Sequence, residues 1–189
     1  MDENWLWNFT QFPGRKFMTE EDMREILYPA AELGIHIAFK NFEVGSLIGG
    51  FLVAPLVPLI RKNGKLAKKK LHHRIGICGR RGMIIGLLAT PLMEYAFINA
   101  KKVDEEGLKD RCYRLRYNKK QLTIDRAVTA AFILGYVANR WIGAVALTNL
   151  TIISGTLYNA FLFDRLRKYN VFGGDQMETP DENYKEKKL

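Results

Sequence analysis

Residues that commonly carry chemistry are scarce in this sequence. Its 189 residues include two cysteines and three histidines. The glycine-rich phosphate loop, the HExxH zinc motif, the CxxC pair and the haem-attachment motif are all absent. His72 and His73 are adjacent and therefore do not share a helix face, so they are not expected to form a pair of metal ligands. The sequence predicts a protein without enzymatic activity and without a bound metal.

Charged residues are absent or nearly absent from three long stretches. Residues 44–60 carry no charge, residues 82–100 carry only Glu94, and residues 127–163 carry only Arg140. The hydrocarbon core of a bilayer is about 30 Å thick and is spanned by roughly 20 apolar helical residues. As one helix, the third stretch would be about 55 Å long at about 1.5 Å per residue. It is too long for a single pass.

We therefore expect the third stretch to fold back on itself at residues 139–141, where a charge and an interfacial aromatic residue would lie at head-group depth. The predicted fold class is all-α, an integral membrane protein with four short, glycine-rich transmembrane helices. These helices are expected at residues 44–60, 82–100, 121–138 and 142–163. A soluble helical bundle is an alternative, which Pro55 and Pro58 favour because proline breaks an exposed helix. A second alternative is a protein with three membrane passes, because residues 101–126 are more basic than an outer loop usually is.

Small residues recur at every fourth position in these stretches. In a bilayer there is no hydrophobic drive between helices, so close approach over small residues is a common way in which they associate. In water each such mid-helix glycine would cost about 1 kcal/mol relative to alanine. The residues expected to form the helix-packing faces are Gly45, Gly49, Gly82, Gly86, Ala127, Ala131 and Gly135.

The chain divides into three parts by composition. Residues 1–41 hold an aromatic N-terminal segment and an amphipathic helix. Residues 42–163 form the predicted four-helix membrane domain. The polar C-terminal extension, residues 164–189, has too few apolar residues to fold alone.

The amphipathic helix of the first part is expected to start near Thr19 and to bend at Pro29. Glu32, His36 and Lys40 trace its polar face, opposite an apolar face. This pattern is typical of a helix that lies on the membrane surface or against a partner.

Glu94 is the one acidic residue within a predicted span. An acid inside a span is costly, so by default it belongs to a functional site or to a buried pair. Glu94 and Arg126 are expected near the outer ends of the second and third helices, which predicts a structural ion pair between them. The alternative is a proton or ion relay, for which several intramembrane acids in register would be expected.

A basic segment at residues 61–81 carries nine Lys or Arg residues and no acid. Short basic loops stay on the inner side of a membrane, so both termini and residues 101–126 are expected on the outer side. The segment has no interleaved aromatic residues for base stacking. We expect it to bind anionic lipid and not nucleic acid. Apart from a bound phospholipid such as cardiolipin, no cofactor is expected. The residues expected at lipid head groups are Lys68, Lys69, Lys70, Arg74, Arg80 and Arg81.

Three segments carry a resemblance to a known family: GSLIG at residues 45–49, RRGMIIG at 80–86 and DRAVTAAFILG at 125–135. They resemble the mitochondrial inner-membrane protein-translocase family, whose fold is shared by an accessory subunit of the membrane arm of respiratory complex I. The resemblance covers about residues 42–163. It implies four helices in the mitochondrial inner membrane with both termini on the intermembrane-space side.

The resemblance implies two roles. The chain would be a non-catalytic accessory subunit of a respiratory complex, most simply complex I or a supercomplex, in contact with other membrane subunits. The alternative is a subunit of a protein-import translocase. Polar extensions at both ends of the chain favour the first role, because they are suited to binding neighbouring subunits.

Two further interpretations stay open. A small solute transporter would use helices broken at Pro55, Pro58 and Pro91 to form a site at mid-membrane. A protein of the endoplasmic reticulum membrane is indicated by the C-terminal KEKKL, which matches a dilysine retrieval pattern, and by a glycosylation sequon at Asn8.

Overall fold

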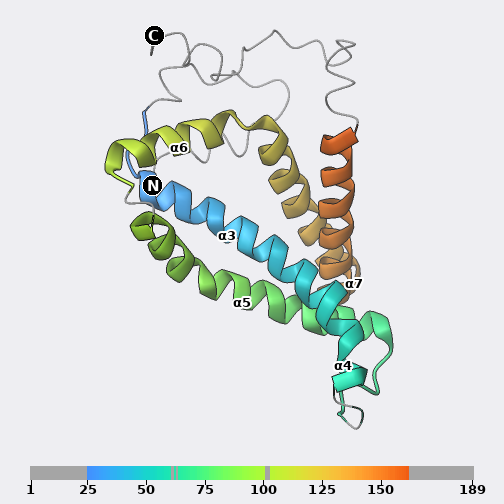
Figure 1. Ribbon diagram of the computed structural model, residues 1–189. Coiled ribbons are helices and arrows are strands. Elements are labelled where there is room, and N and C mark those ends of the chain that lie inside the picture. Colours follow the sequence, from blue (N-terminus) through green and yellow to red (C-terminus); the bar gives the residue numbers. More distant parts are fainter. Residues whose placement is uncertain (1–24, 61, 63, 101–102, 162–189) are drawn as a thin grey trace.

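The computed structural model describes residues 25–161, apart from residues 61, 63, 101 and 102. Every regular element in this part of the chain is a helix (Figure 1), so the predicted all-α fold is confirmed there. In chain order the elements are α3 (Pro29–Leu47), the π-helical segment η1 (Ile48–Val53), α4 (Ala54–Ile60), α5 (Leu71–Ala100), α6 (Glu105–Tyr117) and α7 (Lys119–Phe161).

The first three elements follow one another without a gap and form one long helix from Pro29 to Ile60. Pro29 lies in its first turn, where the missing N–H is not needed, and residues 25–28 are not helical. Pro29 therefore begins the helix and does not bend it, which corrects the sequence prediction. The expected start near Thr19 lies outside the described residues. Because α3 runs through residues 41 and 42, the amphipathic segment and the first apolar stretch are one element.

The π-helical turn lies directly before two prolines. Proline lacks the N–H that would bond the carbonyl four residues earlier. Just ahead of Pro55, the N–H of Ala54 bonds to the carbonyl of Gly49, five residues earlier. The chain thus passes Pro55 and Pro58 without leaving the helix.

The helices α3 and α5 run side by side with their backbones in contact (Figure 1). A Cβ atom added at Gly45 would overlap the carbonyl oxygen of Gly82, and one added at Gly82 would overlap that of Gly45. One turn away on either side, a Cβ atom added at Gly49 or at Gly86 would likewise overlap a backbone carbonyl oxygen of the other helix. The structure brings the four glycines expected in the first two helices into one crossing, where a side chain does not fit.

The backbone of α7 turns back at the predicted place. Its dihedral angles leave the helical region at Asn139 (φ −148°, ψ 38°) and at Arg140 (φ 47°, ψ −138°). Next to this break, Gly135 and Gly143 are in backbone contact with each other. α7 therefore consists of two antiparallel arms joined by a tight turn.

The arms, residues 119–138 and 141–161, are each about 30 Å long at about 1.5 Å per residue. At their open end, Asn159 Nδ2 donates to a backbone carbonyl in the first turn of the other arm at 3.3 Å. The packing face expected on the first arm is shorter than predicted. Ala131 is half-buried, but Ala127 is exposed.

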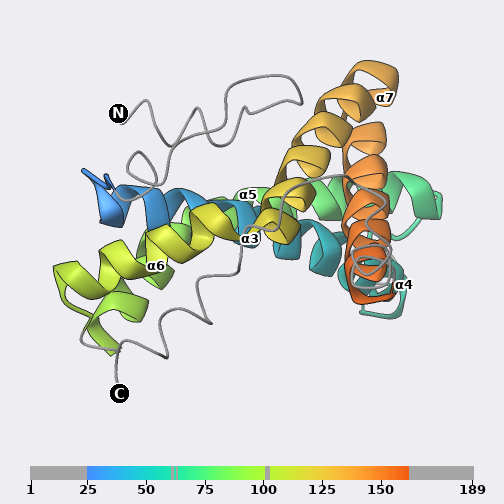
Figure 2. The same ribbon diagram turned by 90° about the horizontal axis from the view of Figure 1, so that it is seen from above.

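A helix occupies much of the segment 101–126, which was expected to be a loop. The side chain of Asp104 caps α6 by accepting from the backbone N–H of Gly107 at 2.9 Å. α6 lies alongside the first turns of α3 (Figures 1 and 2). The buried residues that join them are Ile26, Leu33, Leu108 and Cys112. Arg116 of α6 also pairs with Glu32, so α6 covers part of the polar face of α3.

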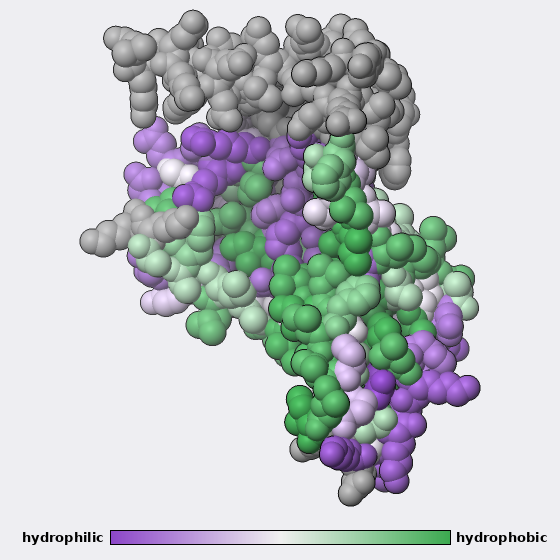
Figure 3. Space-filling view, turned by 45° about the vertical axis from the view of Figure 1, so that its right-hand side comes forward, coloured by the Kyte–Doolittle hydropathy of each residue, from purple (hydrophilic) through white to green (hydrophobic). Residues whose placement is uncertain are grey.

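Three helices in the described part of the chain are long and apolar enough to cross a membrane, at Pro29–Ile60, Leu71–Ala100 and Lys120–Phe161. Each exposes large apolar side chains, for example Ile60 (77% exposed), Leu88 (76%) and Val137 (80%). Figure 3 shows a broad apolar zone between polar surface over α6 at one end and over the loop before α5 at the other. This face of the molecule thus has an apolar middle and two polar ends.

Candidate functional site between α3 and α7

Charged side chains lie buried between α3 and the first arm of α7. Lys40 Nζ is 2.6 Å from Oδ1 of Asp125 and 2.7 Å from Oε2 of Glu43, which is one turn further along α3. The Glu43 and Asp125 side chains are each 6% exposed. A single lysine therefore holds two buried carboxylates and ties two helices together.

The two carboxylates are not equally satisfied. Asp125 Oδ1 accepts a second hydrogen bond from Gln121 Nε2, at 2.8 Å. Glu43 Oε2 accepts from Lys40, but Oε1 of Glu43 is buried and has no hydrogen-bond partner among the described residues. A buried carboxylate oxygen without a donor is costly. Glu43 is therefore the least stabilised member of the cluster.

A second polar contact joins α3 to the other arm of α7. Ser46 Oγ donates to Asn149 Oδ1 at 2.6 Å, and Asn149 Nδ2 donates to the backbone carbonyl of Ser46 at 3.4 Å. Both residues are fully buried, and Gly50 leaves room for the amide. Such hydrogen bonds hold apolar helices in one register.

The structure does not join Glu94 to Arg126. No ion pair connects these two residues in the described part of the chain, and the Glu94 carboxylate lies over Gly34 of α3. The acid of the third helix that is paired is Asp125, which contacts Lys40. The sequence pattern placed Lys40 on an outward-facing polar side and did not indicate its contact with Asp125.

The basic residues expected at head groups are divided between a loop and a helix. α5 begins at Leu71, so the basic segment is a loop only up to residue 70. The side chains that the structure exposes are those of Lys68, Lys69, Lys70 and Arg81. They form a positively charged surface at this end of the molecule.

Arg74 and Arg80 lie within α5 and are partly buried. Arg74 Nη1 donates to the backbone carbonyl of Ala67 at 3.2 Å and so holds the preceding loop. The Arg80 guanidinium lies over the Trp141 ring, 5.5 Å from its centroid. Arg80 of the basic segment therefore lies beside the turn of α7.

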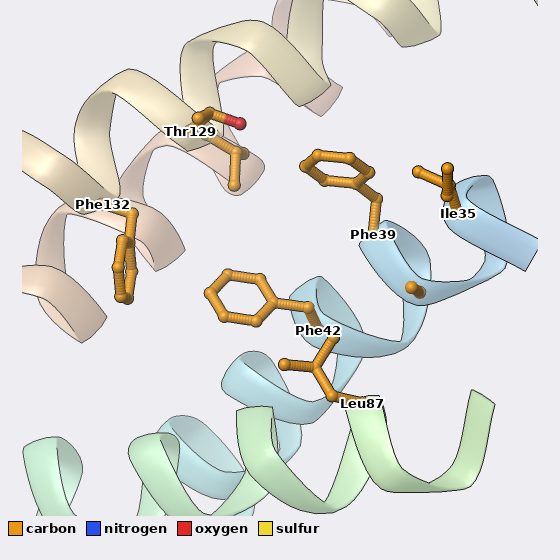
Figure 4. A pocket seen from close by; sticks show the side chains of 8 residues that line it. Ile35, Phe39, Phe42, Leu87, Thr129 and Phe132 are labelled. Atoms are coloured by element: carbon orange, nitrogen blue, oxygen red, sulfur yellow. The ribbon is translucent and has the colours of Figure 1, made fainter. Parts of the chain in front are cut away.

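An apolar groove of about 290 Å³ opens between α3, α5 and the first arm of α7 (Figure 4). Phe42 and Phe132 meet across it edge to face, with ring centroids 5.5 Å apart. The groove is lined by Ile35, Ala38, Phe39, Phe42, Leu87, Val128, Thr129 and Phe132. Its walls suit an acyl chain or another apolar group.

A model of the family described as "Protein of unknown function (DUF1757)" matches residues 5–158. The chain belongs to this family. The DUF1757 match includes the glycine crossing, the charge cluster and most of both arms of α7. No curated protein matches the sequence.

Both cysteines of this DUF1757 chain are buried and free. In the described part of the chain, no group of three or more His, Cys, Asp or Glu side chains could hold a metal ion. The Cys112 thiol donates to the backbone carbonyl of Pro29 at 3.1 Å.

We expect Cys112 of the folded protein to resist N-ethylmaleimide at neutral pH and to react only after unfolding. Burial, and secondarily the charge of Glu32, raises the pKa of this thiol to about 12, so the reactive thiolate is scarce. Mass spectrometry of labelled peptides, with and without denaturant, checks this. Glu106→Cys on the exposed side of α6 is the control and should react rapidly. Full modification of native Cys112 would contradict the packing of α6 on α3.

Proposed function

We propose that this protein is a four-pass membrane protein that serves as a structural, non-catalytic subunit of a respiratory complex in the mitochondrial inner membrane. The observation that carries the proposal is the crossing of α3 and α5, where backbones touch over glycines beneath an apolar exterior.

A lipid environment accounts for the surface of the molecule. Side chains such as Leu88, Leu92 and Ile85 are 66–76% exposed on α5 alone. An apolar surface of this extent is unfavourable in water and neutral in lipid. Within lipid, close backbone approach over glycine supplies the dispersion contacts that the hydrophobic effect cannot supply. The hairpin arms of α7 match the thickness of the hydrocarbon core.

Charge supports one orientation of the helices. Arg80 of the basic segment lies over Trp141 beside the turn of α7, and the loop before α5 belongs to the same basic segment. Lysines at positions 68–70 are exposed there and suit anionic head groups such as those of cardiolipin. This end would face the matrix, as the positive-inside rule favours. α6 and both termini would then face the intermembrane space.

A structural role fits the distribution of polar groups. The contacts of Ser46 with Asn149 and of Lys40 with Asp125 fix helices relative to one another. The exposed apolar faces leave room for helices of neighbouring subunits. The resemblance to an accessory subunit of complex I and the polar extensions at both ends favour a respiratory complex over a protein-import translocase.

The test is extraction in mild detergent followed by native electrophoresis. We expect the chain to migrate with subunits of a respiratory complex and the amount of that complex to fall when the chain is depleted. Migration with translocase subunits would support the import role instead. A chain that runs at its own mass and supports ion or solute flux in liposomes would contradict a structural role. It would favour a transporter, for which the two buried carboxylates beside Lys40 are the supporting observation.

A further inference from the structure

The charge cluster between α3 and α7 contains an excess of acid. The groups that face Glu43 are Lys40 on its own helix and Asp125 on α7. His36, one turn before Lys40, lies within electrostatic range of both Lys40 and Asp125. With His36 neutral and both acids ionised, one ammonium would face two carboxylates. A net negative charge would then be buried.

The hydrogen bonds of the cluster identify where this excess is least tolerable. The Glu43 side chain is 94% buried, and its Oε1 has no hydrogen-bond partner among the described residues. Asp125 accepts from both Lys40 and Gln121, which stabilises its ionised form. A buried charge that exceeds its counter-charge is costly, and the usual outcome is that the group becomes neutral.

We propose that Lys40, Glu43 and Asp125 form a buried site that binds one exchangeable proton on Glu43. In the occupied state the Glu43 carboxylate has taken up H⁺ and is a carboxylic acid, Lys40 is an ammonium ion and Asp125 is ionised. No other bond forms or breaks, and the cluster is neutral. The inference goes beyond a structural role and does not depend on which complex contains the chain.

The experiment is infrared difference spectroscopy of the full chain in lipid nanodiscs. We expect a C=O stretch of a protonated carboxylic acid at neutral pH, which disappears as the pH is raised. Glu43→Gln should remove it. Glu105→Gln, on an exposed pair of α6, is the matched control and should leave it unchanged. Both replacements keep an amide oxygen that can accept from the neighbouring lysine, so both variants should fold.

A second variant tests the charge balance itself. Asp125→Asn leaves one lysine facing one carboxylate, so Glu43 should ionise and the band should disappear although Glu43 is still present. If burial alone kept Glu43 protonated, the band would persist in Asp125→Asn. That result would overturn the proposal that Asp125 is part of the proton site. Labelling the glutamate carboxyls with carbon-13 identifies the residue type without any substitution, since only a glutamic acid band shifts.

Two further results would overturn the proposal. The first is a wild-type spectrum without the band at neutral pH, because both acids would then be ionised. The second is a spectrum in which Na⁺ removes the band while K⁺ does not, because the site would then hold a metal cation in place of the proton.

Discussion

Gly82→Leu is expected to abolish the folded state, and Gly82→Ala to destabilise it by about 3 kcal/mol, at the upper end of the usual range for overpacking. The Cβ of either residue would overlap the backbone carbonyl oxygen of Gly45, which cannot move without displacing α3. Alanine gains up to about 1 kcal/mol in helix propensity over glycine. The steric term is larger, so the net effect remains a loss. Thermal unfolding in detergent, followed by circular dichroism, measures it.

Gly155→Ala is the matched control for this prediction. Gly155 is likewise a glycine within a helix, the second arm of α7. The atoms nearest to a Cβ added there belong to the flexible side chain of Ile124, the first at 3.2 Å. Ile124 can adjust, so the variant should be neutral or slightly stabilised. Equal stabilities of Gly82→Ala and Gly155→Ala would contradict backbone contact between α3 and α5.

Arg116→Met is expected to destabilise the protein by about 3–5 kcal/mol. Arg116 on α6 donates to both carboxylate oxygens of Glu32 on α3, at 2.8 and 2.9 Å, and its Nη1 donates to the carbonyl of Glu25. The two side chains are 1% and 8% exposed, so the substitution would leave the Glu32 charge buried without its partner. Chemical denaturation measures the change in free energy of unfolding.

Two comparisons separate the charge effect from a general sensitivity of α6. Lys109→Met removes an exposed pair with Glu105 and should change the free energy of unfolding far less than Arg116→Met does. The double variant Glu32→Leu with Arg116→Met removes both charges and should recover much of the lost stability. A double variant less stable than Arg116→Met alone would contradict this explanation.

Apolar patterning predicted the helices well where charge is nearly absent. The turn at residues 139–141 was predictable because a run too long for one pass contained a single charge, and the backbone does break at Asn139 and Arg140. The glycines of α3 and α5 were predictable from their spacing of four. The ends of the helices were not predictable from the apolar stretches, because a helix continues past its apolar stretch into polar sequence. α5 therefore includes Arg80 and Arg81.

The buried polar contacts could not be predicted from one sequence. An amphipathic pattern identifies two faces of a helix but not the element that covers each. Glu32, His36 and Lys40 indicated an outward face, yet α6 pairs with the first and α7 with the last. Both pairings join residues about 85 positions apart in the chain, a separation for which helical periodicity carries no information.

The most direct test of the four-pass membrane architecture is cysteine labelling from one side of the membrane. In a Cys78→Ala, Cys112→Ala background, single cysteines replace Lys69, Ala138 and Glu106, all of which are exposed. Mitoplasts are treated with a membrane-impermeant maleimide. We expect Glu106→Cys to be labelled at once, and Lys69→Cys and Ala138→Cys only after the membrane is permeabilised. Labelling of all three sites in intact mitoplasts would contradict a hairpin that crosses the bilayer and, with it, the proposed architecture.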